Sequence, residues 1–554
     1  MTIDTDSPIS SVQTPTSAVI HEVGLRRPVR VWWLWALMLL AGSAARLAWG
    51  YDADELQNLH FAWNIAQGQL PYRDFFEHHP PVFHYALAPF VGGLDRPGWA
   101  LLIGTRIVAL GVAVLVLWAF HRLLLRFVSR QTAALGIGVL LVTHPFGTTI
   151  FELRADWFAL AALLFALDGL LESMNGSTGR QSLRGAVLAG LLAGLGVVLT
   201  QKTALLLAGA GLWAVGCVIA APRPLRRSRI SAIAVFAGAA AVPLLALAGW
   251  FAAHGALGAL VEHTVLINLR WASEGTWRYT ANESLPPILP IAVLAVVGLL
   301  VAVRGIGREL RSASPESAAA MLFLTGLASL LTTPVPHGQS YLFLVVPWAL
   351  LLAMGTLERL VARPDSIRHD RRYYLTAAVV CLLALSPVAA ALSAITWSGL
   401  LLFALKHTDR PRRLVPAAAI LLAIGVVIYS GRAADGLIRH EGTSQAAFIA
   451  FVHDRIPTGA TVLETWPLVT PFRPQPTFHG FARRGPAQTI GVSRLEAEYQ
   501  GALSDGRARF AVVDDHDVRR QLPGFGEFLD ARCRRVPGAP PTRDRLALYD
   551  CGGE

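Results

Sequence analysis

Apolar runs of about 20 residues recur along the chain and are separated by short polar segments. Because a helix needs about 20 apolar residues to cross the hydrocarbon core of a bilayer, each run predicts a membrane-spanning helix. We expect about 13 spans, a number that depends on dividing residues 373–405 into two. The predicted spans cover residues 31–50, 99–120, 132–150, 157–174, 185–200, 203–221, 230–252, 287–303, 317–333, 341–357, 373–391, 393–405 and 414–430.

The charges between the spans predict which side of the membrane each connection faces. Lys and Arg gather on the cytoplasmic side, so Arg26, Arg27 and Arg30 place the N-terminus there and make the first span a signal anchor. The alternation that follows places the polar segment 51–98 and the C-terminus outside. The basic connections cover residues 121–130, 175–184, 223–229, 304–311, 358–372 and 406–413.

Residues 1–30, 31–430 and 431–554 differ in composition and predict three parts. The first is rich in Ser and Thr and is expected to be a disordered cytoplasmic tail, and the second contains the spans. The third combines a helix candidate at 444–454 with strand-like runs at 461–466, 509–515 and 546–551. We therefore expect an all-α polytopic membrane protein with a C-terminal extracytoplasmic α/β domain.

The composition supports a membrane protein and argues against a nucleic-acid partner. Of the 554 residues, 54% are hydrophobic and only 15% are charged, whereas a soluble protein has roughly 25% charged residues. The net charge of +11 comes from basic residues in the predicted cytoplasmic connections, so we predict no nucleic-acid binding. Cys533 and Cys551 lie near each other in the C-terminal part, and a disulfide is predicted between them if that part is outside the cytoplasm.

The first predicted outer loop, residues 51–98, contains several carboxylates and several histidines between two apolar segments. Asp52, Asp54 and Glu55 stand within four residues, at the start of a predicted helix over 53–67. Such carboxylates can act as a general base toward a hydroxyl or an amine, or they can hold a divalent cation. The simpler alternative is that they are hydrated charges at a membrane boundary.

A second polar cluster, PYRDFFEHHPP, covers residues 71–81. Arg73, His78 and His79 are suited to contact an anionic lipid head group or a phosphate. A zinc site is disfavoured because we expect adjacent histidines to point in different directions, and because no HExxH spacing is present. The alternative is an ordinary polar turn bounded by prolines.

Further polar side chains lie at the predicted outer ends of the spans. Arg154 and Asp156 open the fourth span, where ionisable residues are costly unless they are paired or functional. Lys202 interrupts an apolar run and can contact a phosphate or extend to the interface. Other candidates on this side are His337, Gln339 and Tyr341. Because nucleotide sugars are cytoplasmic, an enzyme on the outer face would suit a donor activated by a lipid phosphate.

Taken in order, these segments resemble the GT-C glycosyltransferases. The segments are the signal anchor, Asp54-Glu55, QGQLPYRDFFEHHPP, RAD at 154–156 and LTQKTALLL at 199–207. The resemblance is to the bacterial branch related to protein O-mannosyltransferases and lipid A aminoarabinose transferases, and it covers about residues 30–350. One departure is His79, where the aminoarabinose-transferase branch often has a lysine.

The resemblance implies transfer of a sugar from a polyprenyl-phosphate donor to a lipid, polysaccharide or protein acceptor. The reaction would invert the anomeric centre at the outer face of the bacterial cytoplasmic membrane. Asp54 would be the general base, with Glu55 beside it and Asp52 as the alternate. Asp156 would be a second acidic residue of the cavity, and Lys202 would contact the donor phosphate. No cofactor is expected to be required, although a divalent cation such as Mg²⁺ or Mn²⁺ is compatible, with Asp54 and Glu55 as its ligands.

Other classes of function stay open. A transporter or flippase of lipid-linked saccharides would favour paired charges in mid-membrane and an internal inverted repeat, and the sequence suggests neither. A non-catalytic membrane scaffold would tolerate Asp54→Asn. A ligase that transfers whole oligosaccharides between lipids is an alternative within the enzymes.

Overall fold

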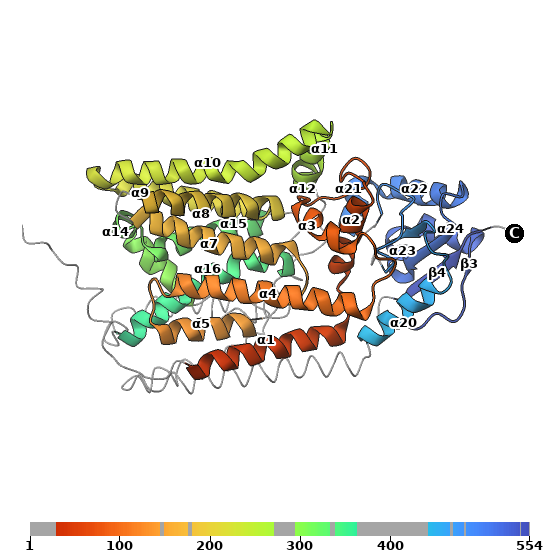
Figure 1. Cartoon of the computed structure of the whole chain (residues 1–554), viewed down its shortest axis with the longest axis horizontal. Coiled ribbons are helices and arrows are strands. Elements are labelled where there is room, and N and C mark those ends of the chain that lie inside the picture. The colour runs from red at the N-terminus through yellow and green to blue at the C-terminus, as the bar shows by residue number, and fades with distance from the viewer. Residues whose placement is uncertain are drawn as a thin grey trace, which may run out of the picture.

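A computed structural model of the chain describes residues 29–143, 149–175, 180–270, 294–332, 338–362, 441–465, 469–480, 484–542 and 545–552. The predicted spans at 373–391, 393–405 and 414–430 lie outside these residues, as does the tail up to residue 28. The described part forms a helical bundle and a smaller C-terminal unit with a sheet, and two helices of the first predicted outer loop lie between them (Figure 1).

The bundle is built from long helices that run side by side (Figure 1). They are α1 (Val29–Trp49), α4 (Trp99–Leu124), α5 (Arg130–Val142), α7 (Ala155–Asn175), α8 (Arg180–Leu199), α9 (Thr203–Ala220), α10 (Arg223–Ala253), α15 (Pro315–Thr332) and α16 (Gly338–Ala362). Shorter helices are α2 (Ala53–Ala66), α3 (Val82–Val91), α11 (Leu257–Val261), the π-helix η1 (Glu262–Leu266), α12 (Ile267–Arg270), an apolar helix over Leu294–Arg304, and α14 (Ile306–Arg311).

Within the described residues, five helices are long and apolar enough to cross a membrane: α4, α7, α8, α9 and α10. Several such helices in one chain are the pattern of a multi-pass membrane protein. Several predicted boundaries differ from those of the structure, most of all at α5 and α10. Helix α5 ends at Val142, short of the predicted 150, and α10 begins at Arg223 because its arginines are good helix formers. The predicted outer loop 253–286 also contains helical turns as far as Arg270.

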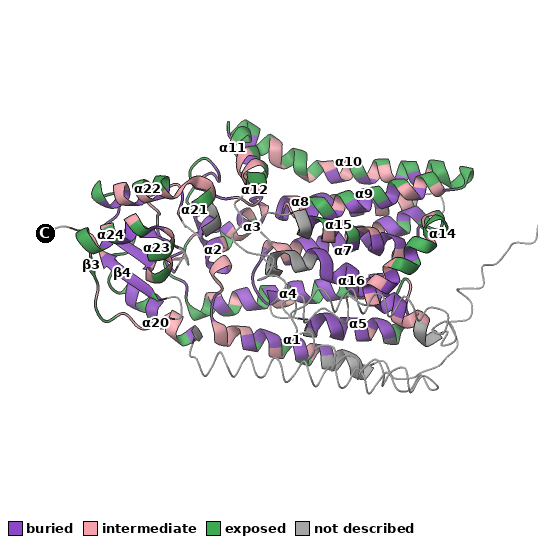
Figure 2. Ribbon diagram, turned by 180° about the vertical axis from the view of Figure 1, so that it is seen from behind, coloured by how far each residue is buried: buried purple, intermediate pink, exposed green. Residues whose placement is uncertain are grey.

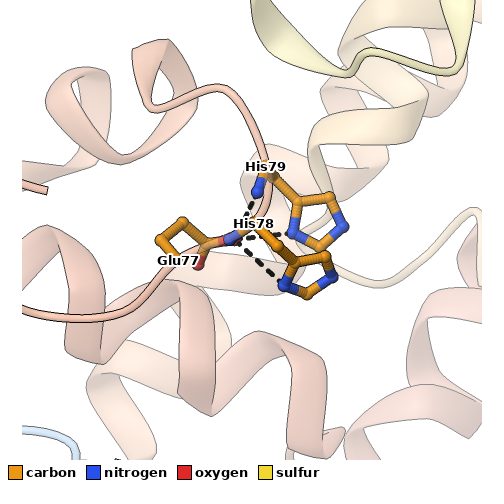
Figure 3. A group of neighbouring side chains, drawn as sticks. All are labelled: Glu77, His78 and His79. Carbon is orange, nitrogen blue, oxygen red and sulfur yellow. Dashed lines mark hydrogen bonds and ion pairs between the residues drawn. The ribbon is translucent and has the colours of Figure 1, made fainter. Parts of the chain in front are cut away.

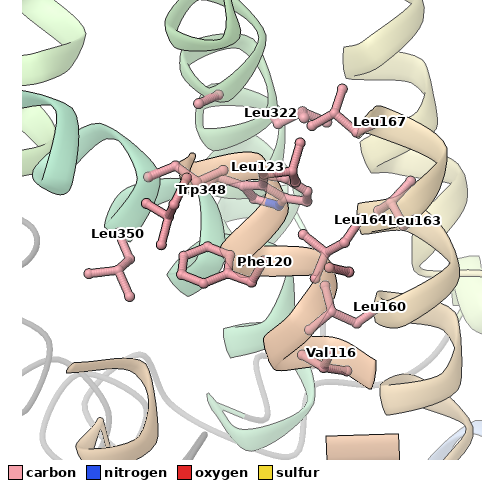
Figure 4. Packing of buried hydrophobic residues seen from close by; sticks show 14 of the residues in the cluster. Val116, Phe120, Leu123, Leu160, Leu163, Leu164, Leu167, Leu322, Trp348 and Leu350 are labelled. Carbon is pink, nitrogen blue, oxygen red and sulfur yellow. The ribbon is translucent and has the colours of Figure 1, made fainter. Parts of the chain in front are cut away.

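The bundle helices pack closely around an apolar core. Phe120 and Leu123 of α4 meet Leu160 and Leu164 of α7, and Trp348 of α16 closes the cluster (Figure 4). In lipid, helices associate through packing and close approach rather than through burial from water. The outward face of α10 is largely exposed, as expected of a helix that faces lipid (Figure 2).

Two glycines one turn apart bring α8 and α10 together. A Cβ atom at Gly190 would lie 2.3 Å from the carbonyl oxygen of Phe236, and one at Gly194 would lie 2.2 Å from that of Ala240. Only glycine allows the two backbones to approach this closely, in the manner of GxxxG contacts.

Helix α2 begins with a capping box and lies at one end of the bundle (Figure 1). The Asp52 side chain accepts from the N–H of Asp54 at 3.0 Å, and the Glu55 side chain accepts from the N–H of Asp52 at 2.9 Å. Its apolar face buries Leu56 and Leu59 in a cluster with residues of α3 and the C-terminal unit. The predicted helix over 53–67 is thereby confirmed.

The C-terminal unit has a mixed four-stranded sheet in the order β1-β2-β4-β3. Strand β1 pairs in parallel with β2, whereas β4 is antiparallel to both β2 and β3. Its elements are α20 (Glu441–His453), β1 (Val462–Glu464), α21 (Arg484–Ile490), α22 (Val492–Ser504), β2 (Phe510–Asp514), α23 (Asp515–Gln521), α24 (Pro523–Arg532), β3 (Arg534–Arg535) and β4 (Leu546–Asp550). Three strands lie where strand-like runs predict them, whereas β3 is too short and polar to predict. Cys533 and Cys551 form a disulfide beside β3 and β4.

The C-terminal unit contacts the start of the first predicted outer loop. The N–H of Tyr51 donates to Gln445 Oε1 at 2.8 Å, and Gln445 Nε2 donates back to the carbonyl of Tyr51 at 3.0 Å. Gly50 has φ +76° and lies against Gln445, so a side chain there would be both strained and obstructed. On the far side of α2, His60 Nδ1 lies 2.9 Å from the carbonyl oxygen of Pro471.

Candidate active site

The three predicted carboxylates at the start of α2 have different surroundings. Glu55 is fully buried and pairs through both oxygens with Arg106 of α4, one of them at 2.8 Å. It also accepts from the N–H of Leu153 at 2.7 Å. Burial opposes ionisation of Glu55, but Arg106 outweighs it and lowers the pKa of the carboxyl. Glu55 therefore joins α2 to α4 as a buried anion.

Asp54 is the most exposed of the three carboxylates, with 36% of its side chain accessible. The guanidinium of Arg154 pairs with Asp54 and lies 3.1 Å from Asp52. Burial opposes ionisation of Asp52, but Arg154 and Arg46 outweigh it and lower its pKa to about 2. Asp52 and Asp54 are thus held side by side by one arginine, with 33% and 36% of their side chains accessible.

Three charged residues that sequence reasoning missed complete this network. Arg46 and Arg106 lie within predicted spans, where an arginine needs an acidic partner. Their position in an apolar run could therefore have marked them as candidates from the sequence. Glu152 pairs with Arg46 at 3.2 Å and with Arg154 at 2.7 Å. Burial raises the pKa of Glu152 to about 7 in spite of these arginines.

Asp156 and Lys202 form a second ion pair. Lys202 Nζ lies 3.2 Å from Asp156 Oδ1, and 12% and 15% of the two side chains are exposed. Arg154 and Asp156, which open the fourth predicted span, are thus paired with different residues, because Arg154 pairs with Asp52, Asp54 and Glu152.

The histidines of the first loop gather around one carboxylate oxygen. Glu77 Oε1 accepts from the N–H groups of His78 and His79, at 2.8 and 2.7 Å, and from His79 Nδ1 at 2.7 Å (Figure 3). The two rings lie with their centroids 3.8 Å apart. The expectation that adjacent histidines point in different directions was wrong, because the segment bends around Glu77 and turns both rings toward it.

Glu77, His78 and His79 could hold a metal ion. One ligand atom from each lies within 4.8 Å of the others, and carboxylate and imidazole are zinc ligands. Burial, then Lys202, lowers the pKa of His79 to about 4, so its ring is neutral at pH 7, as metal binding requires. Asp54 and Glu55 are less suited to a metal, because Arg106 and Arg154 already neutralise them.

Hydrogen bonds and charges connect this loop to the ion pairs. Gln201 Nε2 and Asn268 Nδ2 both donate to the carbonyl oxygen of His78, at 3.2 and 2.8 Å. His79 in turn lies close enough to Lys202, Asp156, Asp54 and Arg154 for their charges to act on the pKa of its ring. The two ion pairs and the Glu77–His79 pair therefore belong to one site.

The remaining predicted site residues lie elsewhere or outside the described part. Arg73 is at the surface, with 54% of its side chain exposed, and its Nε and Nη2 donate to Asp74 at 2.8 Å. His337 lies outside the described residues, as do the side chains of Gln339 and Tyr341 in α16.

No protein-family model and no curated protein matches this sequence. Among solved structures, ArnT from Cupriavidus metallidurans bound to undecaprenyl phosphate has a TM-score of 0.56 and 15% identity, over 94% of this chain and 97% of that one. Apo ArnT gives a TM-score of 0.54 at the same identity and coverage. The apo oligosaccharyltransferase of Archaeoglobus fulgidus gives 0.50 at 12% identity, over 92% of this chain and 73% of that one.

ArnT, a lipid A aminoarabinose transferase, and the archaeal oligosaccharyltransferase are both GT-C proteins. The chain has the GT-C fold. This confirms the fold expected from the motif resemblance. Within this GT-C fold, the predicted residues Asp52 and Asp54 meet Arg154 at one end of the bundle, and Glu55 pairs with Arg106 beside them.

Proposed function

We propose that the chain is a glycosyltransferase that moves a sugar from a polyprenyl-phosphate donor to an acceptor. The observation that carries this proposal is the half-exposed carboxylate of Asp54, held by Arg154 beside the Asp156–Lys202 pair. A base and a cation in one site are what displacement of a phosphate by a hydroxyl requires. The GT-C fold supports it, and ArnT, which shares that fold, has been crystallised with undecaprenyl phosphate.

In the proposed reaction, Asp54 takes the proton of an acceptor hydroxyl or amine. The acceptor atom forms a bond to the anomeric carbon while the bond from that carbon to the phosphate oxygen breaks. The electron pair of the broken bond leaves on the phosphate, and Asp54 later releases its proton to water. A single displacement of this kind inverts the anomeric centre.

Lys202 is the cation that we assign to the departing phosphate. A lysine is a compact point charge, and in a partly buried site its interaction with a phosphate is stronger than in water. His79 contributes hydrogen bonding rather than charge at pH 7, because its ring is neutral there. Arg73, at the surface, is assigned to the lipid head-group region.

We assign the carboxylates of α2 different roles. Glu55 is buried against Arg106, and the side chains of Asp52 and Glu55 form the capping box of α2. The Asp54 side chain takes no part in that box, and we assign it the role of base. No metal is required in this mechanism. A mechanism that uses a divalent cation such as Mg²⁺ or Mn²⁺ is an alternative, and the experiment below distinguishes the two by adding EDTA.

The site is proposed to face the outer side of a bacterial cytoplasmic membrane, on the basis of the basic connections. Residues 431–554 are proposed to form an extracytoplasmic domain that recognises a lipid, polysaccharide or protein acceptor. The contacts of Gln445 with Tyr51 and of Pro471 with His60 support this, since they bring that region against the site. Deletion of residues 440–554 with an unchanged acceptor range would contradict it.

The test measures sugar transfer from synthetic polyprenyl-phosphate sugars to membrane extracts. We expect wild type to transfer sugar with or without EDTA and Asp54→Asn to lose at least about 100-fold. Asp505→Asn, at an exposed aspartate of the C-terminal unit, is the control and retains activity. Loss of wild-type transfer in EDTA would indicate a metal enzyme. Movement of lipid-linked sugar across the membrane without any transfer would indicate a flippase.

A further inference from the structure

Glu152 lies in the segment before α7 and joins two arginines from different elements. Its Oε1 is 3.2 Å from Arg46 Nη2 at the end of α1, and its Oε2 is 2.7 Å from Arg154 Nε. The residue is 5% exposed, and its N–H donates to the carbonyl oxygen of Thr149 at 3.0 Å. No sequence pattern singles out Glu152, and the transfer chemistry proposed for Asp54 does not use it.

The guanidinium of Arg154 connects Glu152 to the proposed base. Its Nε lies 2.7 Å from Glu152 Oε2, whereas its Nη2 contacts Asp54 and lies 3.1 Å from Asp52. Because a guanidinium is planar and rigid, an ion pair at Nε also restricts where Nη2 can lie. The position of Glu152 therefore affects how Arg154 meets Asp54.

The charges around Arg154 are also balanced by Glu152. Apart from the Glu55–Arg106 pair, two arginines face three carboxylates here. These groups are Arg46 from α1, Arg154, Asp52, Asp54 and Glu152. When Glu152 is ionised it shares Arg154 with Asp54, so less of the arginine's attraction falls on Asp54. Burial raises the pKa of Glu152 to about 7, which places this sharing within the physiological pH range.

We propose that Glu152 is a positioning residue, which orients Arg154 and offsets its charge so that Asp54 can accept a proton from the acceptor. This inference rests on the proposed function, since it takes Asp54 as the base. A carboxylate beside an unshared arginine is more stable when ionised and is therefore a weaker base.

Glu152→Gln tests the charge while preserving the size of the side chain. In this variant Arg154 is not shared with an ionised Glu152 at any pH, whereas in wild type it is shared above about pH 7. We expect kcat to fall about 10-fold at about pH 8 and to approach that of wild type below about pH 6, where Glu152 is protonated in wild type as well. A merely structural role would lower kcat by the same factor at both pH values.

Glu152→Asp tests the position while preserving the charge. Its shorter side chain contacts Arg154 less closely and so orients it less well, and we expect kcat at about pH 8 to fall below that of wild type. If Glu152→Gln does not yield folded protein, Glu152→Asp alone tests the proposal. A kcat of Glu152→Asp equal to that of wild type would overturn it.

Asp168→Asn is the matched control. Asp168 is also a buried carboxylate held by two arginines, Arg122 and Arg126, but it lies about 20 Å along α7 from Ala155. Its kcat should change between about pH 6 and about pH 8 in the same proportion as that of wild type. Wild type that transfers no sugar would refute the proposed function. Wild-type transfer with a kcat that Glu152→Gln lowers equally at both pH values, or at neither, would refute only the role of Glu152.

Discussion

Lys202 Nζ lies 3.2 Å from Asp156 Oδ1, although the two residues are 46 positions apart in the chain. They come from the starts of α9 and α7, and both side chains are largely buried. A lysine in such a position is held in place by its partner, so it can present a fixed positive charge to an incoming phosphate.

Replacing Lys202 by Gln is expected to weaken binding of the donor. Loss of one partly buried charge contact to a phosphate corresponds to about 1.5–3 kcal/mol, so the KM for the polyprenyl-phosphate sugar should rise at least about 10-fold. The measurement is steady-state transfer at varied donor concentration. Arg509→Gln, which removes an exposed cation paired with Asp550, should leave the donor KM unchanged. An unchanged KM in Lys202→Gln would remove this residue from the donor site.

Glu55→Gln is expected to destabilise the fold. The variant leaves Arg106 buried without its anionic partner, which typically costs about 3–5 kcal/mol. Thermal unfolding in detergent should show a clear decrease in Tm. The double variant Glu55→Gln/Arg106→Gln should lose less stability than the sum of the losses in the two single variants.

The control for this prediction is an exposed ion pair. Glu262 pairs with Arg270 at 2.9 Å, with 45% and 64% of the side chains accessible. Glu262→Gln should change stability by less than about 1 kcal/mol, because water already screens such a pair. Equal losses in Glu55→Gln and Glu262→Gln would mean that the Glu55–Arg106 pair does not organise α2.

Removing the disulfide is expected to destabilise the C-terminal unit. The bond links Cys533 and Cys551 over a separation of 18 residues, and closing a loop of this length contributes about 3 kcal/mol in the chain-entropy estimate. The double variant Cys533→Ser/Cys551→Ser should therefore be cleaved faster in this region by a protease. Dithiothreitol should accelerate cleavage of wild type but leave the double variant unaffected.

Acid is expected to destabilise the protein through His60. Burial lowers the pKa of His60 to about 4, below the 6.5 of an ordinary histidine. Between these values the unfolded chain binds a proton that the folded chain does not. The free energy of unfolding should therefore have its largest value with respect to this group above pH 6.5. It should decrease as the pH falls toward 4, by at most about 1.4 kcal/mol per pH unit.

Chemical denaturation at several pH values checks this slope. His60→Gln should make stability depend less on pH between 6.5 and 4. His516→Gln, at a histidine with 57% of its side chain exposed, should leave the dependence as in wild type. The same slope in all three proteins would show that His60 titrates normally in the folded state.

The sequence by itself indicated a multi-pass helical membrane protein, and its motifs resembled those of GT-C proteins, whose fold the structure shows. The spanning helices follow from local patterns, since an apolar run of sufficient length has few alternatives to a spanning helix. The run Asp52–Glu55 was similarly recognisable as a helix start with a charged cluster. The start of α10 was less predictable, because polar residues can continue a helix beyond the apolar run.

Only the tertiary structure decided which charges meet. Asp52, Asp54 and Glu55 are nearly equivalent in the sequence, yet Glu55 is buried against Arg106 whereas Asp54 remains half exposed. Pairing depends on how distant helices are packed, and the attraction between charges acts only where packing brings them within a few ångströms. Glu152 became visible as a candidate only once α1, α2 and α7 were assembled around Arg154.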